Sequence, residues 1–75
     1  MALLDDLAEA LAADVMAAQR ELGEKGERLF MEVGNYIGTS SPSLQEAFMT
    51  ACRLHMAADR GRAFFETRVK ALKGE

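Results

Sequence analysis

The stretch CRLHMAADRGR, residues 52–62, holds the side chains with the clearest capacity for chemistry. Cys52 and His55 are the only cysteine and the only histidine of the chain, and Asp59 follows one helical turn later. On a helix, offsets of three and four residues place these three side chains within about 60° of one another. A thiol, an imidazole and a carboxylate in one column could act as a nucleophile with its base and orienting acid, or as zinc ligands.

Neither kind of chemistry has further support in the sequence. The side of a helix supplies no cleft and no free backbone N–H group to stabilise an oxyanion. Zinc ligands usually come from more than one element, and the chain has no second Cys or His. We therefore expect no enzyme, no metal site and no cofactor, and keep a metal-binding or enzymatic role for this column only as an alternative. Cys52 is interpreted as a small apolar filler, and His55 as a boundary residue whose charged form Asp59 stabilises.

Length and composition predict one small helical domain over residues 1–75. The chain carries a net charge of −3. It has one cysteine and therefore forms no internal disulfide. It has no long apolar run for a membrane span, and acids follow directly in the opening MALLDD, so we expect a cytoplasmic protein without a membrane partner. Residues 1–37 are acidic and residues 38–75 are basic, which favours attraction between two helices within or between chains.

The clearest helix boundary in the sequence is GTSSP at residues 38–42. Gly38 is expected to close one helix in the left-handed conformation. Ser41 is expected to cap the next helix, with Pro42 at its first position. A capping box that begins at Ser43 is the alternative start. A helix therefore ends near residue 37 and another begins near residue 42.

The first half of the chain predicts a helix over about residues 3–37. Its apolar stripe is Leu4, Leu7, Leu11, Val15, Ala18 and Leu22, and it resumes in phase at Leu29, Val33 and Tyr36. Gly23 and Gly26 weaken this helix by about 1 kcal/mol each. No Ser, Thr, Asp or Asn lies between Gly23 and Leu29 to cap a new helix, so we favour one helix, kinked or broken at Gly23–Gly26. A complete break there would give a three-helix bundle instead.

The second half predicts a helix over about residues 42–73 that is apolar on two sides. Its main stripe is Leu44, Ala47, Ala51, Leu54, Ala58, Gly61, Phe65, Val69 and Leu72. A second stripe, nearly opposite, is Met49, Cys52, Met56 and Ala63. Two apolar sides need two neighbours, whereas an antiparallel hairpin supplies one. We therefore expect two hairpins to dimerise into a four-helix bundle, with the three-helix monomer as the competing fold.

These features predict a non-enzymatic adaptor or regulator that acts through protein–protein interaction, with a second copy of itself or another protein as partner. The expected interaction surface comprises Met49, Cys52, His55, Met56 and Phe64. Nucleic-acid binding is the alternative, through phosphate contacts of Arg53, Arg60, Arg68 and Lys70. The acidic first half and the negative net charge oppose that alternative.

Overall fold

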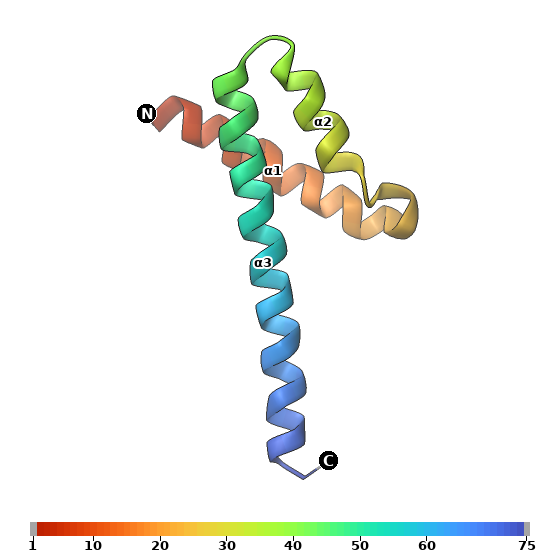
Figure 1. The fold of residues 1–75 in the computed structure, drawn as a ribbon. Coiled ribbons are helices and arrows are strands. Elements are labelled where there is room, and N and C mark those ends of the chain that lie inside the picture. The colour runs from red at the N-terminus through yellow and green to blue at the C-terminus, as the bar shows by residue number, and fades with distance from the viewer. Residues whose placement is uncertain (1, 75) are drawn as a thin grey trace.

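The computed structural model describes residues 2–74, and in this range the chain is built from helices (Figure 1). The elements are α1 (Ala2–Leu22), the 3₁₀ turn η1 (Gly23–Gly26), α2 (Leu29–Gly38) and α3 (Pro42–Leu72). Helices α2 and α3 form an antiparallel hairpin, and α1 crosses α3 (Figure 1). The all-α prediction is confirmed, with three helices packed together.

The chain reverses at Gly23–Gly26, so a single helix over residues 3–37 is wrong. Gly23 has φ +63°, a left-handed conformation that closes α1 and that glycine adopts without steric cost. Gly26 is buried against the end of α1, where an added Cβ would lie 2.8 Å from the Cβ of Leu22. Each glycine therefore permits a step of the reversal that a larger residue would strain, and the alternative of a complete break is correct.

The cap of α2 comes from α1 rather than from its own sequence. Arg28, at the N-cap position, makes no side-chain capping hydrogen bond. Instead, the backbone N–H of Phe30 donates to Oε1 of Gln19, with an N···O distance of 2.8 Å. The prediction of one long helix relied on the lack of a local capping residue. A residue that precedes the break supplies that hydrogen bond once α1 and α2 fold together.

The turn between α2 and α3 confirms one predicted cap and corrects the other. The Ser41 Oγ accepts the N–H of Leu44 at 3.1 Å, and Pro42 is the first residue of α3, as expected. Gly38 is the last residue of α2 and does not have a positive φ, so its predicted left-handed role is wrong. An added Cβ at Gly38 would lie 2.7 Å from the side-chain amide of Gln45. A larger residue at position 38 would therefore require the flexible Gln45 side chain to move.

The core lies where α1 crosses the first half of α3. Its fully or nearly fully buried members are Ala8, Ala12, Val15, Met16, Phe48, Ala51 and Cys52. Small residues on both helices permit a close crossing, and Phe48 is the largest side chain that it encloses. The buried face of α1 is rotated away from the predicted leucine stripe, so Leu7 and Leu22 are half exposed.

Helix α3 continues far beyond this core. It stays helical through Gly61, as the unbroken phase of its apolar residues predicted. We call residues 57–73 the C-terminal arm. Every residue of this arm except the half-buried Val69 is exposed, and the arm projects away from α1 and α2 (Figure 1).

Candidate interaction surface

The column of Cys52, His55 and Asp59 is divided among three environments. Cys52 has no exposed surface and belongs to the core. Burial raises the pKa of its thiol, and the nearby charge of Arg53 lowers that pKa by a smaller amount. A buried thiol held in its neutral form is a poor nucleophile and a poor metal ligand. Cys52 therefore acts as packing in the described structure.

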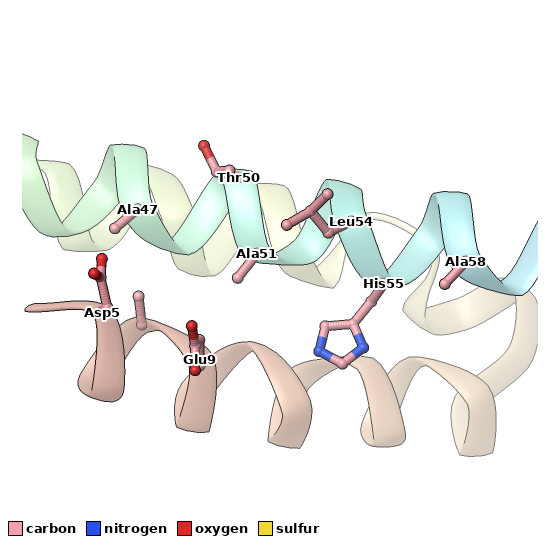
Figure 2. Close-up of a pocket in the computed structure, with 9 residues that line it drawn as sticks. Asp5, Glu9, Ala47, Thr50, Ala51, Leu54, His55 and Ala58 are labelled. Carbon is pink, nitrogen blue, oxygen red and sulfur yellow. The ribbon is translucent and has the colours of Figure 1, made fainter. Parts of the chain in front are cut away.

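His55 and Asp59 are both exposed on α3. His55 points toward α1 from one side of α3 (Figure 2). Asp59 accepts a hydrogen bond from Arg20, with 3.5 Å between Nη1 and Oδ2, and this pair is too exposed to contribute much stability. Within residues 2–74, no three His, Cys, Asp or Glu side chains lie close enough together to hold a metal ion.

The residues predicted as an interaction surface differ in how open they are. Cys52 is enclosed, and Met49 and Met56 are half buried against the core of their own chain. The thioether of Met49 packs on Gly34 of α2, where an added Cβ would lie 2.6 Å from Sδ. His55 and Phe64 are exposed, Phe64 by 71%. Helix α2 thus takes the place beside Met49 that the four-helix dimer predicts for a second copy.

A groove of about 500 Å³ runs along α3 beside the first turns of α1 (Figure 2). Its lining from α3 is Ala47, Thr50, Ala51, Leu54, His55 and Ala58, and its lining from α1 is Asp5, Ala8 and Glu9. In Figure 2, Asp5 and Glu9 rise from α1 toward α3, while Ala47, Ala51 and His55 point toward α1. The groove therefore has an apolar floor of small residues and an acidic rim on one side.

The same face of α3 carries an open apolar stripe that begins in the groove and continues beyond it. Leu54, Phe65 and Leu72 are 66%, 56% and 70% exposed. Ala58 and Gly61 lie between them on this face, and both are exposed as well. We call Leu54, Ala58, Gly61, Phe65 and Leu72 the open stripe. The sequence predicts the main stripe as core and the second stripe as the partner surface. The structure buries Ala51 of the main stripe but leaves Leu54, Phe65 and Leu72 uncovered.

The helix lengths indicate why part of the main stripe stays uncovered. Helix α3 has 31 residues and α1 has 21, so α1 could not cover α3 along its whole length even if the two ran parallel. The apolar phase of α3 nevertheless persists to Leu72. An apolar stripe that outlasts its neighbour within the chain indicates a further neighbour.

Charge is segregated between α1 and the arm. Helix α1 contains the acids Asp5, Asp6, Glu9, Asp14 and Glu21 and the single base Arg20. The arm contains the bases Arg60, Arg62, Arg68, Lys70 and Lys73 and the acids Asp59 and Glu66. The predicted phosphate-facing residues Arg53, Arg60, Arg68 and Lys70 are all exposed on α3. The arm therefore carries net positive charge and α1 carries net negative charge.

Among the described helices, none combines the length and the apolar character needed to cross a bilayer. Comparison of the chain with protein-family models, with curated proteins and with solved structures found no match.

Proposed function

We propose that this chain is a small non-enzymatic adaptor or regulator that acts through protein–protein contact made by the open stripe of α3. The observation that carries the proposal is a regular row of exposed apolar residues on the half of α3 that projects away from α1 and α2 (Figure 1). Single exposed apolar residues are ordinary on protein surfaces, whereas contiguous apolar surface marks an interaction site.

The dimensions of the molecule support the same conclusion. The chain exposes 5751 Å², whereas a compact protein of 8.2 kDa exposes about 4,500 Å². Its radius of gyration is 15.1 Å, against about 11 Å for a compact chain of 75 residues. The excess of about 1,200 Å² exceeds the roughly 800 Å² that each partner buries in a standard interface. The excess exposed area of the isolated chain is therefore large enough to form one side of a standard interface.

A pair of substitutions on the arm tests this proposal. Phe65→Glu places a charge in the open stripe, and Thr67→Glu adds the same charge to an exposed position about 160° around the helix. Both are far from the buried core, so circular dichroism should show native helix content and native unfolding for each variant. We expect Phe65→Glu alone to reduce association, measured by sedimentation velocity of the purified protein and by crosslinking in the native cell. Equal association of the parent and both variants in both assays would contradict the proposal.

A further inference from the structure

We propose that the partner on the open stripe is a second copy of this chain, bound with its α3 antiparallel to the first. A two-fold axis between Ala58 and Gly61 then lays the arm of each copy along the groove of the other. This inference rests on the proposed function and specifies the occupant and its orientation. Three features of the structure carry it: the spacing of the stripe, the position of the groove and the segregation of charge.

The stripe has the spacing of a coiled-coil seam. Its positions alternate in steps of three and four residues through Leu44, Ala47, Ala51, Leu54, Ala58, Gly61 and Phe65, and Leu72 follows one heptad after Phe65. With the two-fold axis between Ala58 and Gly61, Ala58 of each copy faces Gly61 of the other. These two small residues permit close approach of the helices. On either side of the axis, Leu54 then faces Phe65 of the other copy. Leu54 and Phe65 are thus complementary to each other when one helix is reversed, and Arg68, at the seam position between Phe65 and Leu72, faces the small Ala51.

The groove lies where the arm of the second copy would need it. Groove residues of α3 run from Ala47 to Ala58, and the same axis places residues 61–72 of the other copy opposite them. Leu72 of that copy falls over Ala47, where the small side chain leaves room. Because Leu54 and Ala58 belong to both the groove and the open stripe, one docked helix covers both surfaces.

Charge selects the antiparallel arrangement. In a parallel pair, the two basic arms would lie side by side and the two acidic α1 helices would lie at the same end. In the antiparallel pair, each basic arm lies beside the acidic α1 of the other copy, where Glu9 forms part of the groove rim. Complementary charge of this kind sets orientation and suppresses wrong pairings. The interface is isologous, so every contact occurs twice.

The first experiment measures the mass and the affinity of the full chain by sedimentation equilibrium. We expect a species of twice 8.2 kDa at tens of micromolar protein. Phe65→Glu should weaken association at least about a hundredfold because the central contact is lost twice, and Thr67→Glu should leave it unchanged. Glu9→Lys should also weaken it, whereas Glu21→Lys, with the same change of charge on α1 but outside the groove, should not. Equal effects of the two lysine variants would overturn the docking of the arm along the groove.

The second experiment measures orientation with a spin label at the end of the arm. A Cys52→Ala/Lys73→Cys variant carries one label per copy, and its sedimentation confirms that it still associates. The antiparallel pair separates the two labels by about 40 Å, since each lies roughly 13 residues from the axis at 1.5 Å per residue. A parallel pair brings them within about 15 Å. A short distance would overturn the inference and leave the proposed function intact.

The remaining outcomes separate the two proposals. A parent chain that stays monomeric at about 100 µM would overturn self-association. If Phe65→Glu then still abolishes crosslinking to another protein in the cell, while Thr67→Glu does not, the proposed interaction function stands with a different partner. If neither self-association nor crosslinking responds to Phe65→Glu, both the proposed function and the antiparallel dimer are wrong.

Discussion

The reversal at Gly23 makes a prediction in which one chemical change has opposite effects at two sites. An alanine Cβ would meet no atom within 4 Å at either Gly23 or Gly61, so steric contact does not distinguish the two positions. Gly23 has φ +63°, whereas Gly61 lies inside α3 without a positive φ. We expect Gly23→Ala to destabilise the fold and Gly61→Ala to stabilise it.

The magnitudes follow from the backbone conformation. A left-handed alanine costs about 1–2 kcal/mol. Restriction of the unfolded chain by alanine offsets about 0.4–1 kcal/mol of that cost, which leaves a net loss of roughly 0.5–1 kcal/mol at Gly23. In the interior of α3, replacing glycine with alanine gains about 1 kcal/mol. The two variants should therefore differ by about 1.5–2 kcal/mol in free energy of unfolding.

Urea unfolding followed by circular dichroism measures this difference. Both substitutions should be made in the Phe65→Glu background, so that the proposed contact at Gly61 does not contribute. With a denaturant dependence near 1 kcal/mol per molar urea, the two midpoints should differ by roughly 1.5–2 M, on opposite sides of the background protein. If Gly23→Ala instead raises the midpoint as Gly61→Ala does, Gly23 is helical and residues 3–37 form one helix after all.

Three further predictions concern the caps and the buried thiol. Gln19→Ala should lower the free energy of unfolding by about 1 kcal/mol because the N–H of Phe30 loses its acceptor; urea unfolding measures this, and Gln19→Glu, which keeps an acceptor, should lose less. Ser41→Ala should also cost about 1 kcal/mol by the same measurement, and no loss relative to a near-neutral Ser43→Ala would refute the observed cap. Burial raises the pKa of the Cys52 thiol in the folded chain. The free energy of unfolding is therefore unaffected below the usual thiol pKa and falls as the pH rises from that value through the raised pKa. Urea unfolding from neutral to alkaline pH should therefore show a steeper loss in the parent than in Cys52→Ala, and equal losses would contradict this.

Much of the fold follows from local signals in the sequence. The boundary between α2 and α3 is set by Ser41 and Pro42, whose capping chemistry involves neighbours only a few residues away. The continuity of α3 follows from its unbroken apolar phase. The reversal was harder to predict because its stabilising contacts are not local. Gln19 caps α2 only after α2 has folded back, and Gly26 is buried only against the end of that same α1.

Periodicity predicted two apolar sides on α3, and both α1 and α2 pack on this helix. Periodicity alone does not say which side of α3 meets the rest of the chain. Phe48 decides this, because it lies between the two stripes and is fully buried in the core. Its burial turns the face that contains Ala51 and Cys52 inward. Leu54 and Phe65, about 100° away from Phe48, consequently remain outside.

Helix α3 therefore has two adjacent faces that differ in burial. The face around Phe48 packs in the core, and the open stripe is exposed. The two faces meet at Ala51, which is buried in the core and also lines the groove. A helix docked in the groove would further shield Ala51 from water and would bind the folded chain but not the unfolded one. If the proposed dimer forms, the stability of this small core must rise with protein concentration, by the mass action that links folding to association.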